Sequence, residues 1–313
     1  DILQKNWSEI VLERGYFALV EGKMKKQISV LLLIMLAVSA FASGKSENQI
    51  KEINISYVRD PFNLPLTIMK EKQIAEKVFG EKGIGVNYYE ISSGAKQCEA
   101  IAAGSLDIAS VINTASVILA NQAGNPVEIF AGFSRPEKMF VLLTGNDEIR
   151  SVRDLKGKKI AGPKGSVLHE LLVAALEKEG MSIQDIQFIN MGIPAGISAM
   201  AAHRVDAALA AGPAVINAQK NGGRIVFSCE GYVRPLLVSA CGKRFAAEHP
   251  DMIELFNTAL NQAREWMAAN QEEAIRIGAE VAGIPLKDAQ ILYSWSNFIT
   301  HLSSEDLDAI EYD

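Results

Sequence analysis

The chain has 313 residues, of which 49% are hydrophobic and 22% charged, and its formal net charge is −6. This is the composition of a globular protein with one large domain or two ordinary ones. It argues against a nucleic-acid-binding protein, because no run or stripe of lysine and arginine occurs.

Residues 24–42 have the three parts of a secretory signal peptide. Lys25-Lys26 is a basic start, residues 28–38 are apolar, and Ala40-Phe41-Ala42 is a small-residue cleavage signal. The apolar core is shorter than the roughly 18 residues of a membrane-spanning helix. The pattern predicts a periplasmic or secreted protein cleaved after Ala42; the alternative is an uncleaved anchor. A lipoprotein is not expected, because no cysteine follows the core.

The two ends of the chain do not fit an exported protein. Residues 1–23 precede the signal peptide and are interpreted as a non-native extension, with Met24 as the true start. N-terminal sequencing of secreted material tests this interpretation, and a mature protein that contains Tyr16 would contradict it. At the other end the chain stops at Asp313 inside a helical pattern, so we expect a shortened C-terminus.

From residue 51 onward, strand and helix patterns alternate. The strands of a first stretch are predicted over 52–58, 86–92, 106–112 and 127–132, and its helices over 64–79, 94–104 and 113–124. The strands of a second stretch are predicted over 158–162, 186–191, 205–211 and 224–229, and its helices over 166–180, 196–203 and 213–223. Such alternation predicts parallel βαβ units. Helices then follow over 249–283 and 285–295, with a capped helix start at Ser303 or Ser304.

The two stretches resemble each other. A shift of 99 residues places Asp107 on Asp206 and Gly124 on Gly223, and aligns several alanines between them. One interpretation is two lobes with one topology, each a doubly wound, mainly parallel sheet. The other is convergence of two α/β segments on a similar composition.

Turns that join strands to helices are the candidate contact points. In a doubly wound sheet they meet at one crevice, and each helix N-terminus offers free N–H groups and a partial positive charge. The stretch "IAGPKGSVLHELLVAAL" (160–176) contains such a turn. Lys164 precedes Gly165, so the order does not fit a nucleotide P-loop, and no G-x-G-x-x-G follows the first strand. For each serine or threonine in these turns, helix capping alone is the alternative function.

Few side chains indicate catalysis. His169 either faces the crevice or packs against the next strand, and no catalytic or metal-binding motif is present. We therefore expect no cofactor, no metal and no enzyme activity. Cys98 is expected to be buried, whereas Cys229 and Cys241 either pair or remain two inert thiols.

Three segments resemble a known family, over roughly residues 53–313. They are "DLKGKKIAGPKGSVLHELLVAAL", "RVDAALAAGPAV" and "GSLDIASVINTASVILANQAGNPVEIFAG". They are similar to ABC-transporter substrate-binding proteins of the nitrate/sulfonate/taurine and thiamine-pyrimidine (NMT1-like) group. The resemblance implies a type II periplasmic-binding-protein fold with lobe one at 51–143 and 238–313 and lobe two at 144–237. Segments 138–144 and 234–242 would cross between the lobes, which close on a ligand by a hinge.

The resemblance also implies a ligand site and a function. The expected ligand contacts are Asn63, Ser93, Gly94, Asn113, Thr114, Ser134, Gly165, Ser166, His169, Ala195, Gly212 and Pro213. The expected function is that of a monomeric solute receptor, which binds a small anionic or zwitterionic molecule and delivers it to the permease and ATPase of an ABC importer. The alternatives are an enzyme of cofactor biosynthesis on the same fold and a sensor without transport. One departure is that "YVRDPFNLP" after the first strand lacks a tryptophan to hold a flat ligand.

Overall fold

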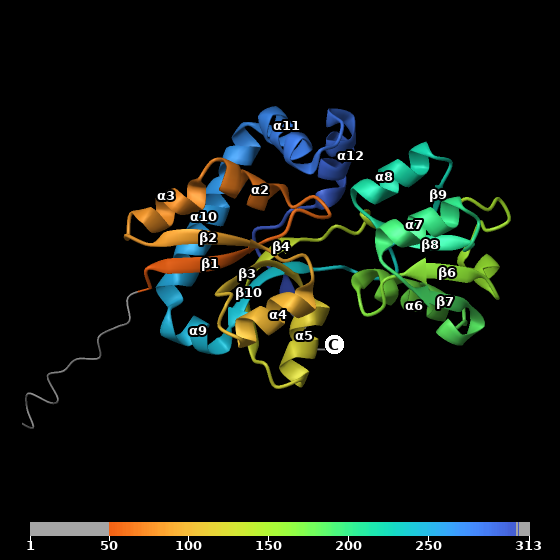
Figure 1. The fold of residues 1–313 in the computed structure, drawn as a ribbon, viewed down its shortest axis with the longest axis horizontal. Helices are drawn as coiled ribbons and strands as arrows, with labels where there is room; N and C mark the ends of the chain where they lie inside the picture. The colour runs from red at the N-terminus through yellow and green to blue at the C-terminus, as the bar shows by residue number, and fades with distance from the viewer. Residues whose placement is uncertain (1–49, 305, 307–313) are drawn as a thin grey trace, which may run out of the picture. The chain divides into compact units, whose positions relative to one another are not determined.

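The computed structural model describes residues 50–304 and residue 306, which form two five-stranded sheets with helices on their faces (Figure 1). The predicted signal peptide, the extension before it and most of the last predicted helix lie outside the described residues. Within the described part, no helix combines the length and the hydropathy that a membrane span needs.

The first sheet has the strand order β2-β1-β3-β10-β4. Its strands are β1 (Glu52–Tyr57), β2 (Gly85–Glu90), β3 (Ile108–Asn113), β4 (Val127–Ser134) and β10 (Leu237–Gly242). Strand β10 is antiparallel to both β3 and β4 and returns from the far end of the chain.

The second sheet has the order β7-β6-β8-β5-β9. Its strands are β5 (Phe140–Thr144), β6 (Lys159–Gly162), β7 (Gln187–Asn190), β8 (Ala207–Ala211) and β9 (Arg224–Ser228). Strand β5 is antiparallel to β8 and β9 and corresponds to β10 of the first sheet. We call the first sheet with helices α2–α5 and α9–α12 the first lobe, and the second sheet with α6–α8 the second lobe.

The two lobes share one topology. In each, the strands follow the order second, first, third, crossing strand, fourth. The 99-residue shift places α4 (Gly94–Ala102) on α7 (Ile193–Ala201) and the start of β3 on the start of β8. The α/β fold is therefore confirmed, with two lobes of one topology.

Helices cover both faces of each sheet (Figure 1). In the first lobe, α2 (Leu64–Glu71), α3 (Ile74–Gly80) and α10 (Pro250–Ala269) pack together on one face, and α4 and α5 (Thr114–Gln122) lie on the other. In the second lobe α6 (Val167–Lys178) covers one face, and α7 and α8 (Pro213–Lys220) cover the other. Buried residues alternate between these faces: Leu142 contributes to the α6 side, and Val141 and Leu143 contribute to the α7 side. A strand buried on both faces needs apolar residues at successive positions, which explains the run in β5.

Two predicted helices differ in the structure. The helix expected over 64–79 is two helices in the structure. Helix α2 ends at Glu71 and α3 begins at Ile74, because Gln73 between them has a left-handed backbone with φ 54°. Helix α2 also packs against α11 (Gln271–Ala282), whereas α3 packs against β2, so the chain bends between them. The helix expected over 196–203 begins three residues earlier, at Ile193, with Pro194 in its first turn, where proline is tolerated.

Two segments connect the first sheet to the second, residues 135–139 between β4 and β5 and residues 229–236 between β9 and β10. The lobe limits expected at 143/144 and 237/238 stay a prediction; β5 lies wholly in the second sheet and β10 wholly in the first. Helix α12 (Leu286–Ser296) packs against α11 and also reaches α8 of the second lobe, where Lys220 Nζ lies 2.5 Å from Asp288 Oδ2. Helix α9 (Lys243–Glu248) precedes α10. Near the end of the chain, the Ser303 N–H donates to Asp306 Oδ2 and the Asp306 N–H donates to Ser303 Oγ, so Ser303 is the predicted cap.

All three cysteines are free and buried, so the alternative of a Cys229–Cys241 disulfide is wrong. Burial raises the pKa of Cys229 and of Cys241 to about 12. Because only the thiolate is reactive, we expect the native protein to react slowly with a disulfide reagent at pH 8 and all three thiols to react rapidly after unfolding. A thiol titration with and without guanidinium measures this, and a fast-reacting native thiol would contradict the inert assignment.

Candidate functional site

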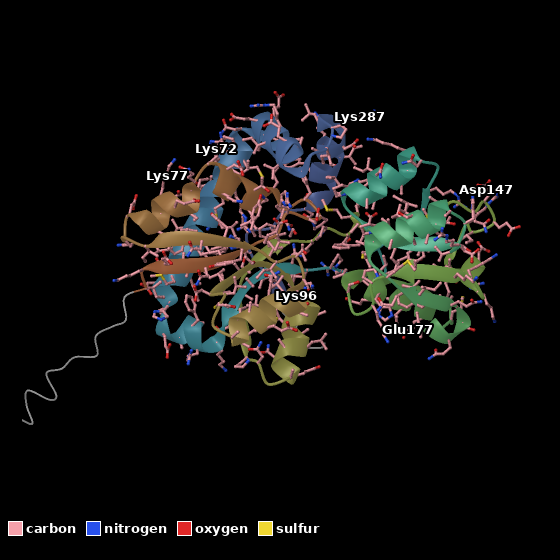
Figure 2. All side chains as sticks on the ribbon, in the orientation of Figure 1. Lys72, Lys77, Lys96, Asp147, Glu177 and Lys287 are labelled. Atoms are coloured by element: carbon pink, nitrogen blue, oxygen red, sulfur yellow. The ribbon has the colours of Figure 1, made fainter. Side chains whose placement is uncertain are left out.

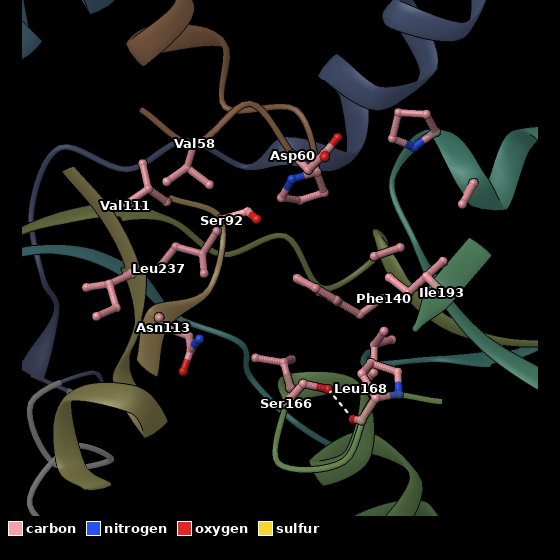
Figure 3. Close-up of a pocket in the computed structure, with 18 of the residues that line it drawn as sticks. Val58, Asp60, Ser92, Val111, Asn113, Phe140, Ser166, Leu168, Ile193 and Leu237 are labelled. Atoms are coloured by element: carbon pink, nitrogen blue, oxygen red, sulfur yellow. Dashed lines mark hydrogen bonds between the residues drawn. The ribbon is translucent and has the colours of Figure 1, made fainter. Parts of the chain in front are cut away.

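A cavity of about 400 Å³ lies between the lobes (Figure 3). It is lined by Val58, Asp60, Pro61, Ser92, Gly94, Gln97, Val111, Ile112, Asn113, Phe140, Pro163, Ser166, Val167, Leu168, Ile193, Pro194, Ala211, Pro213, Ala214 and Leu237. Most of these side chains are apolar, and Asp60 is the one charged residue among the described lining residues. The charged side chains labelled in Figure 2, such as Lys77, Asp147 and Glu177, point outward instead. The cavity therefore suits a ligand with a substantial apolar part.

The first-lobe wall is built where α4 and α5 begin side by side. Asn113 ends β3 and caps α5, since its Oδ1 accepts a hydrogen bond from the Ser116 N–H at 2.8 Å. This leaves the amide nitrogen of Asn113 for a ligand. Gly94 begins α4 so close to α5 that a Cβ on it would lie 2.3 Å from Ser116 Oγ. Two helix N-termini thus meet at one wall and favour a negatively charged group there.

The second-lobe wall is the first turn of α6. Ser166 Oγ donates a hydrogen bond to the Pro163 carbonyl at 2.7 Å, which closes the turn shown by the dashed line in Figure 3. Val167 and Leu168 follow as the first helical residues and line the cavity. The first N–H groups to donate in this turn are those of His169 and Glu170, to the Ser166 carbonyl, so the N–H groups of Val167 and Leu168 before them are the donors for a ligand at this wall.

The loop after β1 closes a third side. Asn63 is buried, and its Nδ2 donates to the carbonyls of Val58 (2.9 Å) and Asp60 (2.8 Å). It therefore shapes the loop that carries Val58, Asp60 and Pro61 to the cavity. Behind the wall, buried Gln97 accepts from Ser56 Oγ and donates to the Val111 carbonyl, which ties α4 to the sheet.

A second cavity of about 380 Å³ shares Ser166 and Val167 with the first. It is lined by α5, the start of α6 and residues 234–236, and it contains His169. The His169 ring packs 4.9 Å from the Phe188 ring. Burial, and then Lys164, lower the pKa of His169, so the imidazole is neutral at neutral pH. His169 thus lines the second cavity and packs against the next strand, β7, while its contact with a ligand stays a prediction.

The structure divides the predicted contact residues into three groups. Those that line the first cavity are Gly94, Asn113, Ser166 and Pro213. Those that line the second cavity are Thr114, Gly165, His169 and, again, Ser166. Those outside both linings are Asn63, Ser93, Ser134, Ala195 and Gly212.

Asn63 holds the loop after β1, and the positions of the other four outlying residues also account for this. Ser93 is the exposed N-cap of α4, and its hydroxyl faces the Lys96 N–H at 3.5 Å. Ser134 is buried at the end of β4, where it pairs with Leu237. Ala195 lies within the first turn of α7, because that helix begins earlier than expected. Gly212 is buried against Pro61 of the first lobe.

Sequence reasoning missed most of the apolar wall. Val111, Ile112 and Leu237 belong to strands and read as ordinary sheet core. Phe140 and Ile193 begin a strand and a helix, and nothing in their local pattern separates them from packing residues. Ser92, Pro194 and Ala214 also line the cavity, and they lie in strand-to-helix turns that are candidate contact points from the sequence.

The family model described as NMT1/THI5 like matches residues 77–274. A putative aliphatic sulfonates-binding protein of Bacillus subtilis (strain 168) is 30% identical over 291 residues, which cover 91% of this chain and 86% of the relative. The chain belongs to the NMT1/THI5-like family. A second relative, the taurine-binding periplasmic protein of Escherichia coli (strain K12), is 29% identical over 230 residues, which cover 70% of this chain and 71% of the relative.

Solved structures show the fold that this NMT1/THI5-like chain shares. The periplasmic aliphatic sulphonate binding protein SsuA from Escherichia coli matches with a TM-score of 0.76 at 22% identity, over 84% of this chain and 85% of its own. The alkanesulfonate-binding protein SsuA from Xanthomonas axonopodis pv. citri, bound to MOPS, matches with a TM-score of 0.74 at 24% identity, over 84% and 90%. The predicted family and the periplasmic-binding-protein fold are both confirmed.

Proposed function

We propose that the protein is the solute receptor of an ABC importer and captures a small organic acid, an aliphatic sulfonate or a close analogue, between its lobes. The single observation that carries the proposal is the composition of the first cavity. Its acid-binding groups are helix N-termini and the Asn113 amide, and apart from Asp60, Gln97 and the serines Ser92 and Ser166 the remaining described walls are apolar. A sulfonate headgroup accepts hydrogen bonds from such donors, and an alkyl chain gains from burial against such walls.

The names of the relatives support this proposal. The relatives are named for aliphatic sulfonates and for taurine, and such ligands have an acid headgroup on a short carbon skeleton. An inorganic anion such as nitrate would leave the apolar walls without a partner. Delivery to a permease and its ATPase, export through a cleaved signal peptide and a monomeric state belong to the same proposal.

The test is isothermal titration calorimetry and thermal unfolding with alkanesulfonates, taurine, nitrate, pyrimidines and amino acids. A specific ligand at 100 times its Kd should add about 2.7 kcal/mol to the free energy of unfolding. We expect alkanesulfonates to bind and to be recovered unchanged by mass spectrometry. Turnover of the bound compound would favour the enzyme alternative, and binding of nitrate in preference to every sulfonate would overturn the proposed ligand class.

Replacing Ser166 with leucine should weaken ligand binding by about tenfold or more and leave the fold intact. Ser166 lines both cavities, so a bulky side chain there intrudes on the ligand's space. Its hydroxyl makes no cap hydrogen bond to α6, so the loss of stability should stay below about 1 kcal/mol. Ser166→Ala is the matched control, because it removes the hydrogen bond to Pro163 without adding bulk. Calorimetry and urea unfolding measure both effects, and an unchanged affinity for Ser166→Leu would reduce this serine to a turn residue.

A further inference from the structure

Phe140 is the one aromatic side chain among the described residues that line the first cavity. It is the first residue of β5, directly after the connection between the lobes. Figure 3 shows its side chain between Val111 and Asn113 of the first lobe and Ile193 of the second. The ring therefore occupies space that a ligand between the lobes would otherwise fill.

The backbone and the ring of Phe140 are both held in place. Strand β5 is paired on both sides, with Phe140 opposite Ala211 of β8. The Phe140 carbonyl also accepts a hydrogen bond from the Cys229 N–H at 3.1 Å. The side chain packs against the buried cluster on the α6 side of the second sheet. A ring supported in this way resists displacement by a ligand, since interiors are close-packed.

The helix N-termini of the first lobe and the Phe140 ring lie at different walls of the cavity. Gly94, Asn113 and Ser166 belong to the helix N-termini, where the acid group of a ligand finds its hydrogen-bond donors. Phe140 and Ile193 lie away from Asn113 in Figure 3 and present no hydrogen-bonding side chain. An acid bound at the helix N-termini would extend its carbon chain toward Phe140.

We propose that Phe140 limits the length of the aliphatic chain that the cavity accepts, so that the receptor selects short-chain alkanesulfonates. This inference rests on the proposed function. The strand neighbour Ala211 lines the same cavity with only a methyl group, so deleting the ring enlarges the cavity instead of exposing a larger side chain. One methylene too many or too few in an apolar pocket changes discrimination by about 10- to 200-fold.

The experiment measures the Kd of the wild type and of Phe140→Ala for ethane-, butane-, hexane- and octanesulfonate by calorimetry. We expect the wild type to bind the shorter sulfonates best and to lose affinity as the chain lengthens. Phe140→Ala should shift the optimum to a longer chain and improve octanesulfonate relative to ethanesulfonate by about tenfold or more. Phe140→Leu, a milder deletion for the case that the alanine variant does not fold, should shift the optimum in the same direction by less.

Phe188→Ala is the matched control. Phe188 packs against the same buried cluster and against His169 but does not line the first cavity. It should lower stability without changing the preferred chain length. If Phe140→Ala or Phe140→Leu weakens all sulfonates by the same factor, the ring is only structural and the inference fails. If the wild type binds no sulfonate of any length, the proposed function fails and the inference fails with it.

Discussion

Replacing Gly94 with alanine should lower ligand affinity by at least about tenfold and the free energy of unfolding by about 1–3 kcal/mol, the usual cost of overpacking. The added Cβ would lie 2.3 Å from Ser116 Oγ, 2.8 Å from Ser116 Cβ and 3.1 Å from Asn113 Nδ2. Contacts this short force α4 and α5 apart. Both helix N-termini would then leave the positions from which they face the cavity, and the cap hydrogen bond of Asn113 would be disturbed.

Two variants separate this effect from the loss of a glycine as such. Gly80 ends α3, and an added Cβ meets nothing within 4 Å, so Gly80→Ala should change neither affinity nor stability appreciably. In the Gly94→Ala background, Ser116→Gly removes the clashing side chain and should restore part of the affinity, which a double-mutant cycle quantifies. Calorimetry and urea unfolding provide the measurements. Wild-type affinity and stability in Gly94→Ala would show that the junction of the two helices does not shape this wall.

Gly94 also shows which features of the site sequence patterns reveal. Its position at a helix start was readable, because a strand pattern precedes it and a helical pattern follows. Its contact with Ser116 was not, because that depends on α4 and α5 beginning next to each other on one face of the sheet. Local chemistry predicted the helix N-termini, and tertiary packing decided how closely they meet.

The apolar part of the site was hidden for a different reason. Strands of a mainly parallel sheet are buried on both faces, so their sequences are apolar whether or not they line a ligand cavity. Val111, Leu237 and Phe140 therefore look the same as Val141 or Leu143, which lie in the core. Which apolar residue faces a cavity follows only from the spacing of the lobes.

The fold itself was more predictable than the site. The alternation of strands and helices and the 99-residue similarity both follow from local patterns, and each extends over many residues. The break at Gln73 and the early start of α7 were missed because packing against neighbouring helices and strands decides them. Asn63 illustrates the same limit at the site, since its hydrogen bonds to the loop after β1 follow from tertiary packing and not from local sequence.

Replacing Gly212 with alanine should weaken ligand binding by about 100-fold, the loss expected when only about one molecule in a hundred keeps the binding-competent arrangement. Gly212 precedes α8 of the second lobe with φ 56° and ψ −132°. A Cβ there would lie 2.6 Å from the Pro61 carbonyl oxygen and 2.9 Å from Pro61 Cβ, both in the first lobe. The methyl group would therefore press one lobe against the backbone of the other and hold them apart.

Gly222→Ala is the control that decides the cause. Gly222 lies in the same lobe, also has a positive φ (87°), and has nothing within 4 Å of an added Cβ. Both substitutions place a side chain at a positive φ, but φ 56° with ψ −132° lies outside the left-handed helical region, so the strain is larger at Gly212. Only the substitution at Gly212 meets the other lobe. Calorimetry should show a large loss of affinity for Gly212→Ala and wild-type affinity for Gly222→Ala, and urea unfolding should show the larger loss of stability for Gly212→Ala. If both variants lose affinity equally, backbone strain is responsible. The close approach of Gly212 to Pro61 would then not be needed for ligand binding.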